Sequence, residues 1–178
     1  RIQFAAFQCI EQIARKDDAL ALPPRQAFAC QMFGALFHRP SYLGPEAAAK
    51  TWEAASTFTQ EGGIALHTRP ATEMKCAGAP LKHAFLIEDI ASRTVGAGKY
   101  EVHYAAPQGA LFGVPIVAEK VRMLFGERGI ATHMQHKLLS IEPGTKWAKF
   151  EKTEVDATTK AEVKSTVELP YDHLHVIP

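Results

Sequence analysis

The chain has 178 residues, of which 47% are hydrophobic, and its formal net charge is +1. These values predict a packed domain and exclude any electrostatic case for contact with nucleic acid or an anionic membrane surface. Three cysteines without a C-x-x-C pair predict no disulfide framework and a reducing compartment. No run of about eighteen or more apolar residues occurs, so we expect no transmembrane segment.

Two apolar helices are expected before residue 39. The first covers residues 1–15, and a pair of prolines separates it from the second, over residues 24–37. Between Arg25 and His38 the second helix has no charge and is apolar on more than one face, which is not typical of a surface helix. This helix either packs under the domain or docks on another protein. We favour docking on a partner, through Phe28, Met32, Phe33, Leu36 and Phe37.

The rest of the chain alternates strands and helices. The pattern predicts helices over 45–58, 80–91 and 114–126, and strands over 64–67, 100–105, 130–134, 137–142, 147–152, 162–168 and 171–177. Two strand–loop–helix units, a strand, a meander and a returning strand are typical of one architecture. We therefore predict an α/β, Rossmann-like dinucleotide-type domain with a central parallel sheet and a β-meander layer, preceded by an α-helical N-terminal extension.

The loop after the strand at 64–67 carries the main candidate for a reactive residue, Cys76. In Lys75-Cys76-Ala77-Gly78-Ala79-Pro80, Cys76 would lie just before a helix N-terminus, where the helix dipole and Lys75 favour the thiolate. A thiolate at the carboxyl edge of a sheet is a nucleophile, yet a small residue in a tight loop would give the same pattern. His67 or His83 could lie near Cys76, although His83 is expected on the surface.

The loop at 107–113 occupies the place where a Rossmann unit binds a pyrophosphate. It contains Gly109 and Gly113, but Leu111 and Phe112 lie between them and crowd the close backbone approach that a pyrophosphate needs. No G-x-G-x-x-G occurs in the chain. We therefore predict no tight binding of a nicotinamide nucleotide.

Metal binding is also considered. His173 and His175 would share one face of a strand, as zinc ligands can, and His133 and His136 flank a strand end. The sequence places no third ligand beside either pair. We predict no metal site.

The residues from about Pro40 to Pro178 resemble the sulfide:quinone oxidoreductases of the flavoprotein disulfide reductase superfamily. Order and spacing agree through Lys50-Thr51-Trp52, Glu61-Gly62-Gly63, Met74–Lys82, Gly109–Val114 and Tyr171–Pro178. In that family the cysteine of the Lys-Cys-Ala-Gly-Ala-Pro motif carries sulfide sulfur beside the flavin, and the resemblance gives this role to Cys76. It also implies that Lys75, Gly78, Gly109 and Gly113 lie on flavin-facing loops.

The resemblance implies an organisation and two alternative functions. Residues 1–39 would be the docking extension, and residues 40–178 a sulfide:quinone oxidoreductase-like domain without its flavin-binding half. Such a chain would hold no cofactor alone, and FAD if the missing half is present. We favour a non-catalytic accessory subunit that binds other protein subunits of a larger, mitochondrial assembly. The alternative is part of an active enzyme, in which Cys76 forms a persulfide from sulfide and electrons pass through FAD to quinone.

Overall fold

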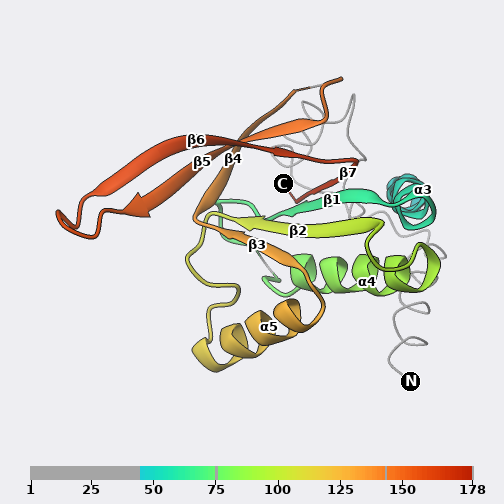
Figure 1. Ribbon diagram of the computed structural model, residues 1–178, viewed down its shortest axis with the longest axis horizontal. Coiled ribbons are helices and arrows are strands. Elements are labelled where there is room, and N and C mark those ends of the chain that lie inside the picture. Colours follow the sequence, from blue (N-terminus) through green and yellow to red (C-terminus); the bar gives the residue numbers. More distant parts are fainter. Residues whose placement is uncertain (1–44, 75, 143, 178) are drawn as a thin grey trace. The chain divides into compact units, whose positions relative to one another are not determined.

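The computed structural model describes residues 45–74, 76–142 and 144–177 (Figure 1). The chain divides into two compact units, Arg1–Ser56 together with Pro178, and Thr57–Ile177. The expected helices at 1–15 and 24–37, the docking residues on the second of them, and the proposed boundary at residue 39 lie outside the described residues. No helix in the described ranges is long and apolar enough to cross a membrane.

The described residues form three helices and seven strands, arranged largely as the sequence predicts. The elements are α3 (Pro45–Glu61), β1 (Gly63–Thr68), α4 (Ala79–Thr94), β2 (Tyr100–Ala106), α5 (Pro115–Glu127), β3 (Ala131–Met134), β4 (His136–Glu142), β5 (Trp147–Val155), β6 (Glu162–Pro170) and β7 (His173–Val176). One sheet has the order β3-β2-β1-β7, and its neighbouring strands all pair in parallel. A second, antiparallel sheet has the order β4-β5-β6. The predicted fold class is confirmed.

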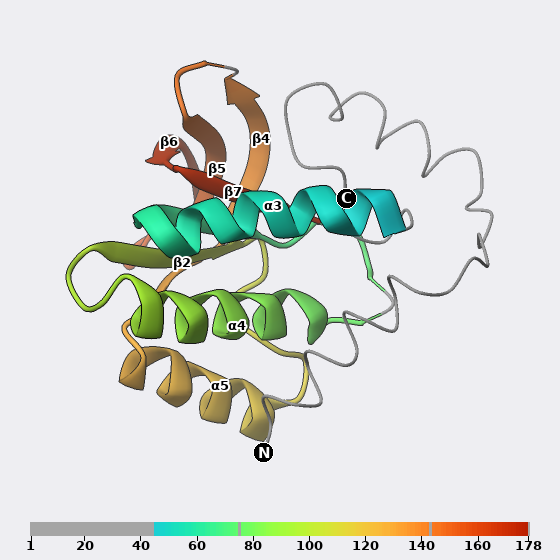
Figure 2. The ribbon, with the colours of Figure 1, turned by 90° about the vertical axis from the view of Figure 1, so that its right-hand side faces the viewer.

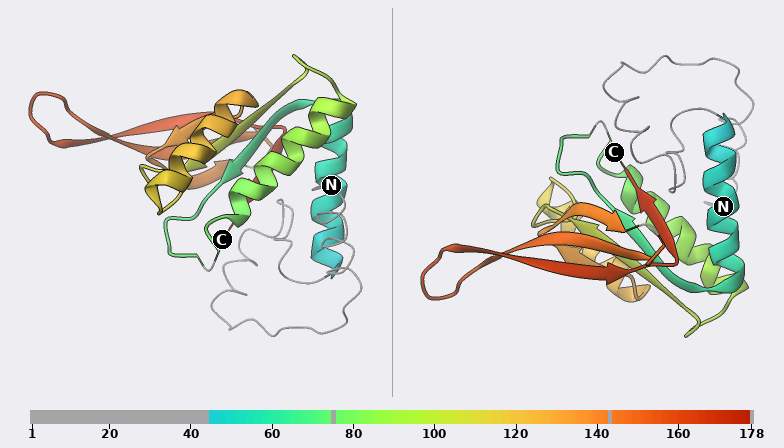
Figure 3. Two further views of the ribbon diagram at one scale, coloured as in Figure 1. Left: turned by 90° about the horizontal axis from the view of Figure 1, so that it is seen from below. Right: turned by 90° about the horizontal axis from the view of Figure 1, so that it is seen from above.

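Helices α4 and α5 lie side by side along one face of the parallel sheet, and the long hairpin of β5 and β6 extends beyond it (Figures 2 and 3). The aromatic core lies on the helix-covered face. Phe125 of α5 packs edge-on against Tyr104 of β2 and Phe85 of α4, with ring centroids 5.7 and 4.8 Å apart. Burial raises the pKa of Tyr104 to about 12. Because strand side chains alternate between faces, the register pairs Ala65–Val102 and His67–Tyr104 place these residues on this same face.

The entry to β1 depends on two glycines. Gly62 and Gly63 have φ of +86° and +98°, and a Cβ on Gly62 would lie 2.2 Å from the carbonyl oxygen of Lys99. A Cβ on Gly63 would lie 2.4 Å from Oδ2 of Asp172, which accepts a hydrogen bond of 3.0 Å from the Ile64 N–H. That hydrogen bond and Lys146 lower the pKa of Asp172. These close approaches fix the start of β1 against the segment that leads into β7.

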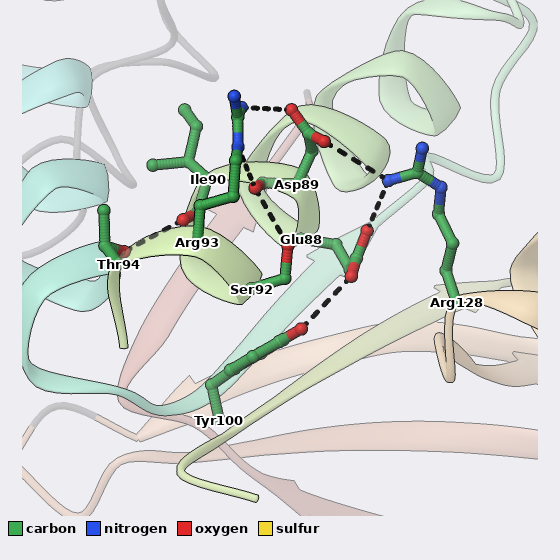
Figure 4. Close-up of polar contacts among 8 residues, drawn as sticks. All are labelled: Glu88, Asp89, Ile90, Ser92, Arg93, Thr94, Tyr100 and Arg128. Atoms are coloured by element: carbon green, nitrogen blue, oxygen red, sulfur yellow. Dashed lines mark hydrogen bonds and ion pairs between the residues drawn. The ribbon is translucent and has the colours of Figure 1, made fainter. Parts of the chain in front are cut away.

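The C-terminal half of α4 is anchored by a buried carboxylate. Glu88 accepts hydrogen bonds from the Tyr100 hydroxyl at 3.1 Å and from Nη1 of Arg128 at 2.7 Å, and Asp89 lies 3.6 Å from the same Arg128 nitrogen (Figure 4). The hydrogen bond with Glu88 is the largest cause that raises the pKa of Arg128. This end of α4 is therefore held by charge, whereas its first turn is not.

Candidate functional site

Two loops meet at the carboxyl edge of the parallel sheet. Residues 69–78 follow β1 and residues 107–114 follow β2, and in a parallel sheet such loops share one edge. Gln108 Nε2 donates a hydrogen bond of 3.3 Å to the Pro70 carbonyl, and a Cβ on Gly78 would lie 3.9 Å from the Phe112 ring. The second loop therefore braces the first at both of its ends.

Cys76 is exposed on the first loop, immediately before α4. Its carbonyl accepts a hydrogen bond of 3.1 Å from the Ala79 N–H, and Gly78 is the N-cap residue without a side-chain cap. Pro80 lies in the first turn, where its missing N–H costs nothing. Cys76 therefore lies two residues before the N-cap of α4 and is open to small solutes. Lys75 lies outside the described residues.

The second loop does not form a nucleotide cradle. Leu111 is only 4% exposed. A Cβ on Gly109 would lie 3.0 Å from Nε2 of Gln135, and the Gln135 N–H donates a hydrogen bond of 3.1 Å to the Gln108 carbonyl. Gly113 has open space beside it. A flavin or nicotinamide pyrophosphate needs close approach to consecutive backbone amides, which a glycine-rich turn provides, and this loop has bulky residues between Gly109 and Gly113.

Four imidazoles gather on the helix-covered face of the sheet, and we name them the helix-side cluster: His67 of β1, His83 of α4, and His173 and His175 of β7. His83 stacks on His175 with centroids 3.8 Å apart and planes inclined by 14°. The ring of His67 lies 5.0 Å from that of His83, 6.1 Å from His173 and 5.8 Å from His175. The expectation that His173 and His175 share one strand face is confirmed, because they pair with Ala65 and His67.

Burial dominates the electrostatics of this cluster. It lowers the pKa of His67 well below 6.5, and the neighbouring histidines lower it further, while a backbone group of His103 acts weakly in the opposite direction. Burial also lowers the pKa of His83 to about 4. Both imidazoles are therefore neutral at physiological pH.

His83 is half-buried, so the sequence interpretation of it as a surface residue holds only in part. Nδ1 of His83 is fully buried and makes no hydrogen bond among the described residues. The signal was present in the spacing, since His83 lies three residues after Pro80 and four before Ile87, and both of these side chains are buried on the inner face of α4. Locating that face requires the start of the helix, which the structure places at Ala79.

Three further imidazoles form the meander-side cluster on the opposite face: His103 of β2, His133 of β3 and His136 of β4. Nδ1 of His103 lies 3.0 Å from Nε2 of His133, and Nε2 of His103 lies 2.9 Å from a carboxylate oxygen of Glu101. The His136 ring is 5.6 Å from that of His133 and hydrogen-bonds the Met134 carbonyl through Nδ1 at 2.7 Å. Burial is again the largest cause that lowers the pKa of His133 to about 4.

The two clusters contain every histidine of the described ranges. His38 is the eighth histidine of the chain and lies outside them. Within those ranges no three His, Cys, Asp or Glu side chains are arranged so that they could hold a metal ion. The chemistry that the described residues offer is therefore an exposed thiol close to a helix N-terminus and imidazoles on both faces of the sheet.

We compared the sequence and the fold with those of known proteins. No family model matches the chain. The mitochondrial sulfide:quinone oxidoreductase of Mus musculus is 33% identical over 129 residues, which are 72% of this chain and 27% of that protein. The same enzyme of Dictyostelium discoideum is 29% identical over 72% of this chain and 26% of that protein. The chain thus spans about a quarter of the length of the curated relatives it matches.

Solved structures share the fold. The crystal structure of the sulfide:quinone oxidoreductase from Aquifex aeolicus matches with a TM-score of 0.55 and 16% identity over 79% of this chain and 33% of that one. A chain of the Tetrahymena thermophila mitochondrial ATP synthase matches with a TM-score of 0.56 and 13% identity over 90% of this chain and 37% of that one. The fold of the chain therefore belongs to the class of Rossmann-like α/β domains with a meander layer. More particularly, the chain carries a sulfide:quinone oxidoreductase-like partial domain, as its sequence predicts.

Proposed function

We propose that this chain supplies the cysteine-bearing part of an FAD-dependent sulfide:quinone oxidoreductase, in which Cys76 receives the sulfur of sulfide as a persulfide. The observation that carries the proposal is the setting of Cys76. It is exposed at the carboxyl edge of the sheet, two residues before the N-cap of α4, on a loop that the second loop contacts. The 33% identity with the mouse enzyme supports it.

The proposed step balances as a two-electron oxidation. The Cys76 thiolate and HS⁻ give a persulfide anion on Sγ, one proton and two electrons. A new S–S bond forms and the S–H bond of sulfide breaks. The electron acceptors in this proposal, FAD and then quinone, are assigned to protein outside the described ranges, because the chain has no G-x-G-x-x-G turn for the flavin pyrophosphate.

The test uses the native protein, purified with whatever flavin-bearing polypeptide accompanies or continues it. Anaerobic sulfide is expected to bleach the visible flavin band, and Cys76→Ser is expected to abolish that bleaching. Cys9→Ser and Cys30→Ser are the matched controls and should bleach like the parent protein. Bleaching that survives in Cys76→Ser would reject Cys76 as the acceptor of sulfur.

A second candidate is a non-catalytic accessory subunit of a larger mitochondrial assembly. The fold likeness to a chain of the Tetrahymena ATP synthase structure, over 90% of this chain, favours it. Both curated relatives are named as mitochondrial, which supports a mitochondrial location under either proposal. This candidate predicts no flavin band in the native assembly and loss of co-purifying subunits in Phe33→Asp and Phe37→Asp. A sulfide-bleachable flavin at one per chain would reject it.

A further inference from the structure

Three polar groups without partners lie where the chain leaves β1 and β2 at the carboxyl edge of the parallel sheet. They are Nε of Arg69, the hydroxyl of Tyr104 and Oε1 of Gln108. Each of these atoms is closed to solvent and makes no hydrogen bond among the described residues. A buried polar group without a partner is costly, so each of the three requires an explanation.

The strand register places Arg69 and Tyr104 on the same face of the sheet. Tyr104 of β2 lies opposite His67 of β1. The Arg69 N–H donates a hydrogen bond of 3.0 Å to the Ala105 carbonyl, which continues the pairing of the strands one residue beyond β1. Because strand side chains alternate between faces, Arg69 shares the face of His67 and is a diagonal neighbour of Tyr104. In agreement, burial raises the pKa of Tyr104 and the Arg69 cation opposes that change.

Gln108 reaches the same place from the second loop. Its Nε2 donates a hydrogen bond of 3.3 Å to the carbonyl of Pro70, the residue after Arg69. Because a carbonyl can only accept, the amide nitrogen of Gln108 must face Pro70, and Oε1 remains as an acceptor. The three residues therefore bring a cation, a hydroxyl and an acceptor to the carboxyl edge of the sheet, where open α/β sheets bind their ligands.

We infer that Arg69, Tyr104 and Gln108 form a binding site for a small monovalent anion that has a hydrogen of its own to donate. Hydrogencarbonate and hydrosulfide both have this chemistry. The Arg69 guanidinium supplies the positive charge and a hydrogen bond, the Tyr104 hydroxyl donates a second, and Oε1 of Gln108 accepts the hydrogen of the anion. The inference goes beyond the proposed function and does not rest on it, because binding requires no persulfide on Cys76.

The charge of Arg69 selects an anion. Arg93, Arg122 and Arg128 each pair with a carboxylate. Of the ion pairs that the described residues form, none involves Arg69. A guanidinium with a buried nitrogen and no carboxylate partner gains more from an incoming anion than one that is already paired.

The packing around Tyr104 favours an ion of a few atoms over a larger ligand. The Tyr104 side chain has no exposed surface, and its ring packs edge-on against Phe125 with centroids 5.7 Å apart. Leu111 of the second loop is also buried. Arg69 is only half-buried, so the anion enters from the side of its guanidinium. Because the three unpaired atoms are closed to solvent, the Arg69 side chain is expected to shift when the anion binds.

The test is an NMR titration of the isotope-labelled full chain that carries Cys76→Ser, so that persulfide chemistry cannot contribute. The signals of the Arg69 Nε–H and of the Gln108 side-chain amide are followed as hydrogencarbonate or, anaerobically, hydrosulfide is added. Nitrate is the matched probe, because it resembles hydrogencarbonate in shape and charge but has no hydrogen to donate. At least one of the first two anions is expected to bind, and nitrate about tenfold more weakly than hydrogencarbonate if hydrogencarbonate is the ligand.

Two variants and a control locate the site. Arg69→Leu is expected to weaken binding about tenfold or more, because it removes the cation. Tyr104→Phe keeps the ring against Phe125, removes only the hydroxyl and should weaken binding about threefold or more, which keeps the test open should Arg69→Leu not fold. Arg122→Leu removes an exposed arginine that pairs with Glu119 and should bind like the reference chain.

The outcomes are distinct. Binding of hydrosulfide alone identifies the anion as the substrate of the proposed reaction, and binding of hydrogencarbonate alone identifies it as an oxyanion. Failure of both anions to bind would overturn the site, as would equal binding of hydrogencarbonate and nitrate. Unchanged affinity in the folded Arg69→Leu or Tyr104→Phe chain would overturn it as well.

Discussion

Histidine side chains have different surroundings on the two faces of the parallel sheet. On the helix-covered face, His67 and His83 lie in an apolar, tightly stacked setting where their partners are other imidazoles. On the meander face, His103 links the Glu101 carboxylate to His133 by hydrogen bonds of 2.9 and 3.0 Å. The comparison teaches that strand alternation decides whether a histidine packs among other rings or joins a polar chain that reaches solvent.

The two clusters adjoin different loops of the candidate site. His67 of the helix-side cluster lies two residues before the loop that carries Cys76. His136 of the meander-side cluster follows Gln135, whose N–H donates a hydrogen bond of 3.1 Å to the Gln108 carbonyl of the second loop.

The largest expected effect comes from a substitution at the start of β1, which should destabilise the whole domain. Gly62→Ala would place a Cβ 2.2 Å from the Lys99 carbonyl oxygen at a φ of +86°. The free energy of unfolding should fall by about 3 kcal/mol, measured by urea denaturation. Because no titrating group is involved, the loss should be the same at pH 7.5 and pH 5.5.

Gly98→Ala is the control for this prediction. Gly98 also has a positive φ, +81°, but nothing lies within 4 Å of a Cβ there. It should cost only about 1 kcal/mol, from backbone strain alone. Equal losses in the two variants would show that the close approach at Gly62 does not constrain β1.

The next effect measures how much of the loss of stability in acid comes from His83 of the helix-side cluster. Lowering the pH from 7 to 4.5 crosses most of the interval between the ordinary histidine pKa of 6.5 and the value of about 4 at His83. The neutral folded form therefore loses stability relative to the protonated unfolded form, by about 2 kcal/mol for His83. His83→Leu should remove that share of the acid loss in urea titrations. An acid loss identical in His83→Leu and the parent chain would contradict the assignment.

The smallest expected effect tests how much the Glu101 carboxylate contributes to the stability of the meander-side cluster. Glu101→Gln removes the carboxylate that meets His103, but the Glu101 side chain is 67% exposed. The free energy of unfolding at pH 7 should change by less than about 0.5 kcal/mol. A loss above about 1.5 kcal/mol would mean that the carboxylate, and not packing, holds this cluster together.

Much of the fold could be predicted because its signals are local. Pro45, Pro80 and Pro115 mark helix starts, and apolar alternation marks β2. The histidine clusters could not be predicted from the sequence, because they depend on the register between strands that are distant in sequence. The sequence pairs His133 with His136, and their rings do lie 5.6 Å apart, but only the register of β2 with β3, in which His133 lies opposite Ala105, shows that His103 is a third neighbour. Likewise, the inner position of His83 requires the exact start of α4.

The measurement that tests the central claim most directly is the intact and peptide mass of the native protein after anaerobic turnover with sulfide. If Cys76 is the acceptor, the peptide that contains it gains the mass of one sulfur atom, and a thiol reductant removes that gain. Flavin reduction by sulfide without any such gain at Cys76, or with the gain at Cys9 or Cys30 in its place, would contradict the account.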